Sequence, residues 1–170
     1  MDIHYRQLEL DDIEAIYDLL TKDETSRYQS WVIETLEDTE QYINQMISLC
    51  EQKKMHYRVI EDKDTQKLIG VCRITLNQKH HKGEIGYMIH PDYWGKGIAT
   101  HAAKDLIRYG FDDLSLNRIY AVTDVRNNGS IRVLEKCGLQ REGLMRQDKI
   151  IRGNYRDSYM YSILKQEYRG

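Results

Sequence analysis

The sequence predicts an α/β domain built on a mixed β-sheet, and three observations lead to this prediction. Segments with the apolar–polar alternation of strands are interspersed with segments that have the helical period of roughly 3.6 residues. Three consecutive strand-like segments are joined by short polar turns. A strand, a helix and a strand then follow between residues 84 and 125, as in a parallel crossover unit. The expected order is β-α-α-β-β-β-α-β-α-β-β, in a single domain spanning residues 1–170.

The N-terminal part of the chain is expected to contain one strand and two helices. Residues 3–10 alternate in polarity and suit a strand. Residues 11–22 suit a helix, because the aspartate that opens them is followed three residues later by a glutamate, as in a capping box. After a polar loop, Thr35 and Asp38 have the same spacing and predict a second helix. Its apolar face would carry Leu36, Ile43, Met46, Ile47 and Cys50.

The rest of the chain supplies six strands and two helices of the expected order. The strands are expected at residues 56–62, 67–76, 83–90, 119–125, about 142–150 and 155–164. The sequence "RGN" between the last two is a hairpin signal. One helix should begin after Gly97, with Ile98, Ala102, Leu106 and Ile107 on one face. The other should occupy residues 127–138 and end at Gly138.

Composition excludes several classes of function. With 25 basic and 27 acidic residues the net charge is −2, so we expect no direct nucleic-acid partner. No apolar run reaches the roughly 18 residues that a membrane span needs, and the N-terminus is too polar for a signal peptide. We therefore expect a cytoplasmic protein without a membrane partner. Cys50, Cys72 and Cys137 lie far apart and form no C-x-x-C pair, so no metal site is expected.

Residues 90–100 contain the clearest candidate for a ligand site. Two glycines, Gly95 and Gly97, stand at the start of a predicted helix, where unpaired N–H groups and the helix dipole attract phosphate. A dinucleotide fingerprint would need glycine at Thr100, and a Walker A loop would need serine or threonine after Lys96. Taken alone, a Gly-x-Gly segment fits a flexible helix entrance equally well.

The glycine segment resembles the acyl-CoA loop of the GNAT acetyltransferases, which is written Gln/Arg-x-x-Gly-x-Gly/Ala. Gly97 and Ala99 match this pattern, whereas Trp94 stands where glutamine or arginine is usual. The resemblance continues in the family segment Asn-x-x-Ser-x-x-x-x-x-Lys-x-Gly-Phe. Four of its positions match, with leucine in place of the final phenylalanine; the matching residues are Asn127, Ser130, Lys136 and Gly138.

Both ends of the chain also resemble the RimJ/RimL branch of that family, which includes ribosomal-protein N-terminal and polyamine acetyltransferases. The similarity therefore covers almost the whole chain in the same order. It implies the GNAT acyl-CoA N-acyltransferase fold, with a parallel strand pair that splays apart to admit acetyl-CoA. Backbone groups near the end of the strand at 83–90 would bind the pantetheine arm, and the glycine loop would bind the pyrophosphate. The residues implied in cofactor binding are Met88, Ile89, His90, Gly95, Lys96, Gly97, Ile98, Ala99, Thr100, Asn127 and Ser130.

The resemblance also implies roles in catalysis. A backbone N–H near Met88 would hydrogen-bond the thioester carbonyl. Ser130 would protonate the departing thiolate and Asn127 would orient the cofactor, although both residue types are also preferred helix caps. Glu84 matches a strand glutamate that acts as a base through a water, but a strand glutamate can equally face solvent. Lys149 stands where other relatives carry a carboxylate, and proton transfer through water to bulk solvent is the alternative.

The acceptor is expected to be a primary amine, with a protein or peptide α-amine ahead of a polyamine or other small amine. Residues 23–40 contain six acidic side chains and one arginine, which would attract a cation or simply form a solvated surface. Tyr28 and Trp31 would wall the acceptor groove or belong to the core. Two other classes of function remain, a non-catalytic acyl-CoA sensor and a nucleotide-binding regulator. A homo-oligomer is expected only because members of the family that the chain resembles often form dimers.

Overall fold

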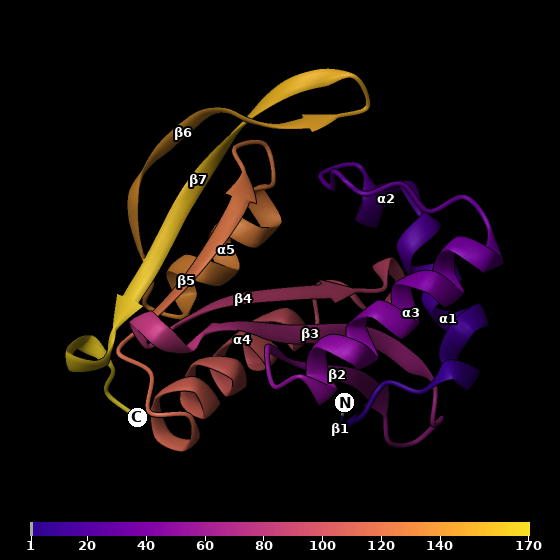
Figure 1. The fold of residues 1–170 in the computed structure, drawn as a ribbon, viewed down its shortest axis with the longest axis horizontal. Helices are drawn as coiled ribbons and strands as arrows, with labels where there is room; N and C mark the ends of the chain where they lie inside the picture. The colour runs from indigo at the N-terminus through magenta and orange to yellow at the C-terminus, as the bar shows by residue number, and fades with distance from the viewer. Residues whose placement is uncertain (1) are drawn as a thin grey trace.

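The computed structural model describes residues 2–170. Its strands form one seven-stranded mixed sheet in the order β1-β2-β3-β4-β5-β7-β6 (Figure 1). Its strands are β1 (Ile3–Arg6), β2 (Met55–Asp62), β3 (Leu68–Asn77), β4 (Lys82–Ile89), β5 (Arg118–Asp124), β6 (Gln140–Ile151) and β7 (Asn154–Leu164). Its helices are α1 (Ile13–Thr21), α2 (Asp23–Ser26), α3 (Leu36–Glu51), α4 (Ile98–Arg108) and α5 (Asn128–Lys136). The predicted α/β class and the predicted order of elements along the chain are confirmed, and the short helix α2 is additional.

The start of the first helix differs from the prediction. The strand β1 ends at Arg6, and the capping box is formed by Glu9 and Asp12 rather than by Asp11 and Glu14. The Asp12 carboxylate accepts a hydrogen bond from the Glu9 N–H at 2.9 Å and two from the Arg6 guanidinium at 2.7 and 2.8 Å. Because Asp12 makes both sets of bonds, it determines where the chain leaves the strand. At α3 the predicted box is confirmed, with the Asp38 N–H 3.0 Å from the Thr35 hydroxyl.

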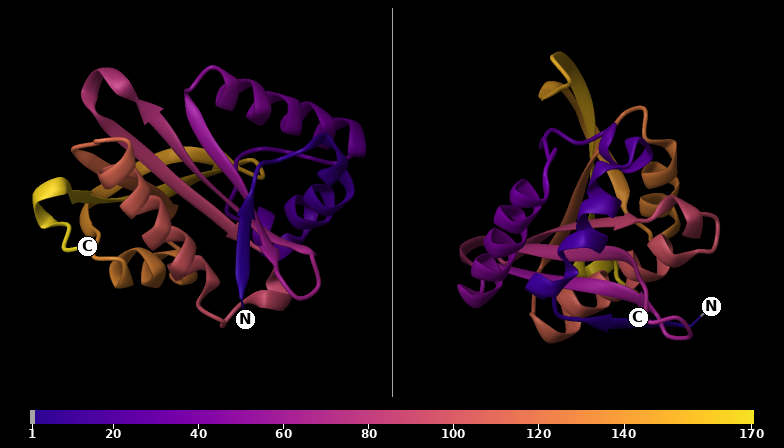
Figure 2. Two further views of the ribbon diagram at one scale, coloured as in Figure 1. Left: turned by 90° about the horizontal axis from the view of Figure 1, so that it is seen from below. Right: turned by 90° about the vertical axis from the view of Figure 1, so that its right-hand side faces the viewer.

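Helices cover both faces of the sheet (Figures 1 and 2). One core cluster lies against α4 and α5 and contains the β4 residues Ile85 and Ile89. The other lies against α1 and α3 and contains Tyr57 and Val71, with Met88 packed against it. Successive β4 side chains therefore enter opposite layers, as strand geometry requires. Within residues 2–170, no helix is both long enough and apolar enough to cross a membrane.

The two halves of the sheet separate between β4 and β5. These strands are parallel and pair at only three positions, the last of which joins Glu84 to Tyr120. Beyond Glu84, β4 stays paired with β3, while β5 stays paired with β7 along its whole length. Figure 1 shows the resulting divergence, with β5, β6 and β7 rising away from β4. The predicted splayed parallel pair is present, and it opens toward the glycine segment.

Candidate active site

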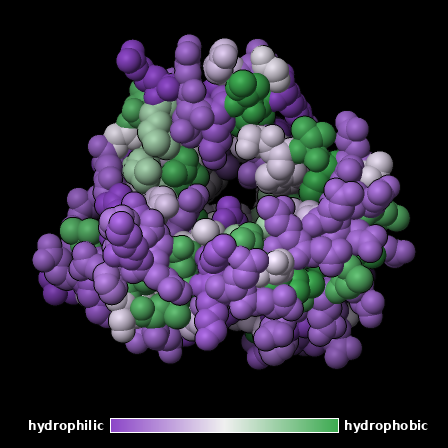
Figure 3. Space-filling view, viewed as in Figure 1, coloured by the Kyte–Doolittle hydropathy of each residue, from purple (hydrophilic) through white to green (hydrophobic). Residues whose placement is uncertain are grey.

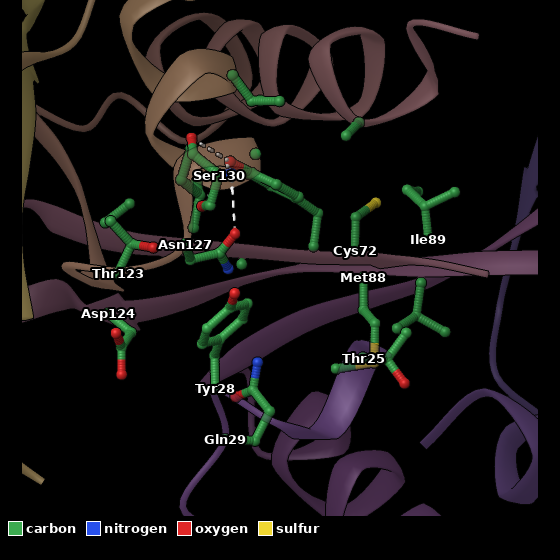
Figure 4. A pocket seen from close by; sticks show the side chains of 18 of the residues that line it. Thr25, Tyr28, Gln29, Cys72, Met88, Ile89, Thr123, Asp124, Asn127 and Ser130 are labelled. Atoms are coloured by element: carbon green, nitrogen blue, oxygen red, sulfur yellow. Dashed lines mark hydrogen bonds between the residues drawn. The ribbon is translucent and has the colours of Figure 1, made fainter. Parts of the chain in front are cut away.

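A cavity of about 780 Å³ occupies the space between the two halves of the sheet. Its lining comes from β3, β4, β5, the glycine segment, the start of α5 and the segment that contains α2. Figure 3 shows it from outside as a hollow near the centre of the molecule, and Figure 4 shows its interior. Ile89 and Ser130 lie on one side of the strands in Figure 4, whereas Met88 and Tyr28 lie on the other. The cavity therefore passes through the sheet and has two sides.

The backbone of the glycine segment explains why glycines stand at this helix entrance. Gly95 and Gly97 have φ angles of +77° and +79°, in the left-handed region that other residues adopt at a cost of roughly 1–2 kcal/mol. Gly97 is the N-cap of α4. A Cβ atom at either glycine would have no heavy atom within 4 Å, so the space above the loop is open. A phosphate fits there, against the unpaired N–H groups of the first helical turn.

Trp94, which departs from the usual acyl-CoA loop, anchors this segment to the sheet. Its indole Nε1 donates a 2.7 Å hydrogen bond to the carbonyl oxygen of Ile89, the last residue of β4. The side chain is 51% exposed and also lines the cavity. The tryptophan thus holds the loop by a bond to the protein itself, and the backbone cradle formed by the glycines is retained.

Two residues predicted to contact the cofactor are occupied elsewhere. Lys96 does not line the cavity, and its ammonium lies 4.8 Å from the centre of the Tyr93 ring. His90, expected to contribute backbone groups, does not line it either. Its N–H bonds the Ile69 carbonyl at 2.8 Å, its carbonyl accepts the Tyr93 N–H at 2.9 Å, and its ring Nε2 lies 2.9 Å from an Asp18 carboxylate oxygen. The other predicted cofactor residues all line the cavity, namely Met88, Ile89, Gly95, Gly97, Ile98, Ala99, Thr100, Asn127 and Ser130.

The direction of the β4 backbone narrows the choice of the N–H donor that was predicted near Met88 for the thioester. The His90 N–H bonds the Ile69 carbonyl of the β3 side at 2.8 Å, and the β3–β4 register has no irregularity from residue 82 to residue 89. Backbone groups alternate in direction along a strand, so the N–H of Met88 also points to β3. The groups that point to the gap belong to Tyr87 and Ile89, the two neighbours of Met88.

Ser130 lies beside a tyrosine that the sequence analysis did not single out. The Ser130 Oγ and the Tyr87 hydroxyl are 3.1 Å apart, and burial raises the pKa of Tyr87. Asn127 is the N-cap of α5, since its Oδ1 accepts the Ser130 N–H at 3.1 Å. The capping role is therefore real, but it occupies only the oxygen of the amide. The Nδ2 group of Asn127 and the Ser130–Tyr87 hydroxyl pair remain to face a ligand.

Glu84 lines the cavity at the point where β4 and β5 part. Glu84 is half-buried. The pKa of the neighbouring Tyr120 is raised first by the burial of Tyr120 and second by the negative charge of Glu84. Lys149 also lines the cavity, whereas Asp148 is exposed and does not. Glu84 is thus the carboxylate nearest to the opening of the strand pair among those that line the cavity.

Aromatic side chains wall the side of the cavity that faces α1 and α3. Tyr28 and Trp31 both line it, and Trp31 also packs against the adjoining core cluster. Tyr42 and Tyr57 complete the wall, and their hydroxyl oxygens are 3.0 Å apart. This aromatic chamber opens on the same layer as Glu84, because even-numbered residues of β4 face it.

The comparison with known proteins agrees with this geometry. A family model described as acetyltransferase (GNAT) domain matches residues 2–140. The chain belongs to the GNAT acetyltransferase family.

Named relatives of this GNAT chain differ in what they acetylate. The uncharacterized N-acetyltransferase YoaA of Bacillus subtilis is 38% identical over 164 residues, covering 94% of this chain and 92% of its own. The putative ribosomal N-acetyltransferase YdaF of Bacillus subtilis is 41% identical over 95 residues, covering 56% of this chain and 52% of its own. The structure of spermidine N-acetyltransferase from Vibrio cholerae in complex with CoA and spermine has a TM-score of 0.86 at 27% identity, covering 98% of this chain and 96% of that one.

Membership of the GNAT family identifies the protein as an acetyl-CoA-dependent N-acetyltransferase. The cavity is consistent with that cofactor, because an open, side-chain-free loop at a helix N-terminus suits the pyrophosphate. The nucleotide-regulator alternative is set aside because the family match extends from the first strand into the beginning of β6, and the sensor alternative because the matched relatives are named N-acetyltransferases.

Proposed function

We propose that this GNAT enzyme acetylates the α-amine of a peptide or protein N-terminus. The observation that carries the proposal is the charge of the acceptor side of the cavity. The acidic residues of the segment 23–40 were expected either to attract a cationic N-terminus or a polyamine or to form a solvated surface, and of these only Glu24 lines the cavity. Asp23 instead pairs with Arg27 and Arg152, and Asp38 caps α3. The remaining carboxylate of the cavity, Asp124, is paired with Arg126, so Glu84 and one exposed rim carboxylate are left, which suits an acceptor with a single ammonium group.

The positions of the side chains divide the work of the reaction. Acetyl-CoA supplies the acetyl group as a thioester, and transfer forms an N–C bond, breaks a C–S bond and releases CoA thiol and a proton. An α-amine with an ordinary pKa near 8 is largely protonated at pH 7, so a proton must leave it before attack. Glu84 accepts that proton, directly or through one water. The Tyr87 and Ile89 backbone, which points to the gap, orients the thioester.

The other side of β4 deals with the leaving group. Ser130 hydrogen-bonds or protonates the sulfur, and Tyr87 fixes the direction of the serine hydroxyl through their 3.1 Å contact. Asn127 holds the cofactor through its Nδ2 group while its oxygen caps α5. Gly95 and Gly97 leave the pyrophosphate free to reach the start of α4. Removal of the proton from the amine and stabilisation of the thiolate therefore both depend on β4, whose two faces carry Glu84 and Tyr87.

An acceptor panel tests the proposal. Release of CoA thiol is followed with a peptide whose only amine is its N-terminus, with an N-terminally blocked peptide that contains lysine, and with spermidine. We expect the first peptide to have the highest kcat/KM, and mass spectrometry to place the acetyl group on its terminal nitrogen. Faster turnover of spermidine would instead favour a polyamine acetyltransferase, the activity named for the Vibrio cholerae relative.

A further inference from the structure

An arginine of β3 projects into the acceptor side of the cavity without a carboxylate partner. Arg73 lies opposite Gly86 in the β3–β4 register and opposite Tyr57 in the β2–β3 register. A Cβ atom at Gly86 would lie 3.3 Å from Arg73 Nε. The guanidinium therefore lies across the glycine, toward the opening between β4 and β5. The missing side chain at Gly86 leaves it uncovered on that side.

Of the three other arginines that line the cavity, two have carboxylate partners, and the third, Arg132, belongs to α5 rather than to the β3–β4 face. Arg27 pairs with Asp23 at 2.7 Å, and Arg126 pairs with Asp124 at 2.7 Å. Within residues 2–170, the Arg73 side chain has one hydrogen bond, from Nη1 to the Thr75 hydroxyl at 2.7 Å, and no ion pair. A guanidinium has five N–H donors in a planar fork that matches a carboxylate. Most of that capacity is available to a ligand.

Arg73 and Glu84 face the same layer and present opposite charges to it. Gly86 is two residues after Glu84 on the same face of β4, roughly 7 Å along the strand. Arg73 Nη1 bonds the hydroxyl of Thr75, which is the residue opposite Glu84, so the guanidinium lies on the Glu84 side of Gly86. We propose that the acceptor carries a carboxylate close to its reacting amine, with the amine toward Glu84 and the carboxylate held by Arg73. This inference rests on the proposed function, because it places the amine of that reaction at Glu84.

The same arrangement opposes a polyamine acceptor. A second ammonium group placed a few ångströms from the first would lie against the Arg73 guanidinium, and like charges in a partly desolvated site repel. Two molecules supply the required chemistry, a free α-amino acid and a peptide with Asp or Glu at its N-terminal end. The aromatic wall formed by Tyr28, Trp31, Tyr42 and Tyr57 suits the apolar part of either one.

The test compares acceptors that differ only in the carboxylate. Free amino acids are set against their carboxamides, and peptides beginning Ala-Asp against Ala-Asn, at saturating acetyl-CoA. We expect kcat/KM to favour the acidic member of one series by roughly ten- to a hundredfold, the range for hydrogen bonds to charged groups. The series that shows the preference identifies the source of the carboxylate. Equal rates in both series, or spermidine as the fastest acceptor, would overturn the inference.

Two variants assign the preference to one side chain. Arg73→Gln should abolish it, and Arg73→Lys, which keeps the charge but not the fork, should retain only part of it. The matched control is Arg27→Gln, because Arg27 also lines the cavity but already has a carboxylate partner. This control should keep the wild-type ratio, and a loss equal to that of Arg73→Gln would contradict the assignment.

Binding measurements separate this inference from the proposed function. Calorimetric titration of acidic and amide acceptors into the CoA-loaded protein requires no turnover. If the acidic compounds bind more tightly and Arg73→Gln removes the difference while no acceptor is acetylated, the carboxylate site is supported and the proposed reaction is wrong. If acceptors are acetylated but neither binding nor turnover depends on the carboxylate, the reaction is supported and the inference is wrong.

Discussion

Asn127 allows a direct separation of a structural role from a ligand-binding role, because its two amide atoms do different things. The oxygen caps α5 by accepting the Ser130 N–H at 3.1 Å, and the nitrogen is left for the cofactor. Aspartate caps a helix as well as asparagine does, but it has no N–H group to donate. The Asn127→Asp variant should therefore keep the cap and lose the ligand bond. Asn127→Ala should lose both.

The magnitudes follow from these two bonds. Loss of an N-cap costs about 1 kcal/mol, which lowers the melting temperature of a chain of this size by roughly 2–4 °C. We expect that decrease for Asn127→Ala, and a melting temperature equal to or above the wild-type value for Asn127→Asp, because a negative charge at a helix N-terminus is favourable. Loss of one ligand hydrogen bond is worth about 0.5–1.5 kcal/mol, so both variants should bind CoA roughly 2- to 13-fold more weakly.

Thermal unfolding of the free protein and calorimetric titration with CoA measure the two quantities independently of the acceptor. Asn77→Asp is the matched control, since Asn77 caps a 3₁₀ turn by accepting the His80 N–H at 3.1 Å and does not line the cavity. It should change neither the melting temperature nor the affinity for CoA by a comparable amount. Unchanged CoA binding in Asn127→Asp would refute the ligand role and leave Asn127 as a cap alone.

Three further predictions concern other parts of the molecule. Ser130→Ala should lower kcat by about 10²-fold or more at unchanged CoA affinity, and full turnover in this variant would exclude the leaving-group role. Gly97→Ala should lower stability by about 1–2 kcal/mol in denaturant titrations and weaken CoA binding, whereas Gly143→Ala, which also meets open space but without a positive φ, should do neither. Hydrogen bonds from Arg118 and then Ser162 lower the pKa of Glu142 to about 2, so its contribution to stability is complete above the ordinary glutamate pKa and is lost as the pH falls toward 2. Glu142→Gln should therefore flatten the acid limb of a stability–pH profile, and an unchanged limb would show that the contact contributes little.

The order of the elements was predictable because each depends on local periodicity and turn signals. Positions where distant residues compete were not predictable in this way. The first α-helix begins at Ile13, two residues later than expected, because Asp12 bonds Arg6 at the end of the strand. His90 was expected near the cofactor through its backbone, but its N–H bonds the Ile69 carbonyl and its carbonyl accepts the Tyr93 N–H.

The pairing of Tyr87 with Ser130 illustrates the same limit within the active site. The two residues are 43 positions apart, and no spacing rule connects them. The signal that was present is the alternation of β4, which assigns Tyr87 to the layer of α4 and α5 once the apolar Ile85 and Ile89 are assigned to it. The sequence therefore predicts the face of β4 on which Tyr87 lies, but not that Tyr87 contacts Ser130.

That alternation also explains how β4 contributes to acceptor binding on one face and to handling of the CoA thiol on the other. Odd positions of β4 face the layer that contains Ser130 and the start of α4, whereas even positions face the aromatic chamber and Arg73. The thioester must lie at the gap because β5 leaves β4 after Glu84, and the backbone groups exposed there belong to odd residues. Changes at even positions should accordingly alter the choice of acceptor, and changes at odd positions the handling of the CoA thiol. Gly86 is the even position with no side chain, which is why an arginine from the neighbouring strand can reach the chamber there.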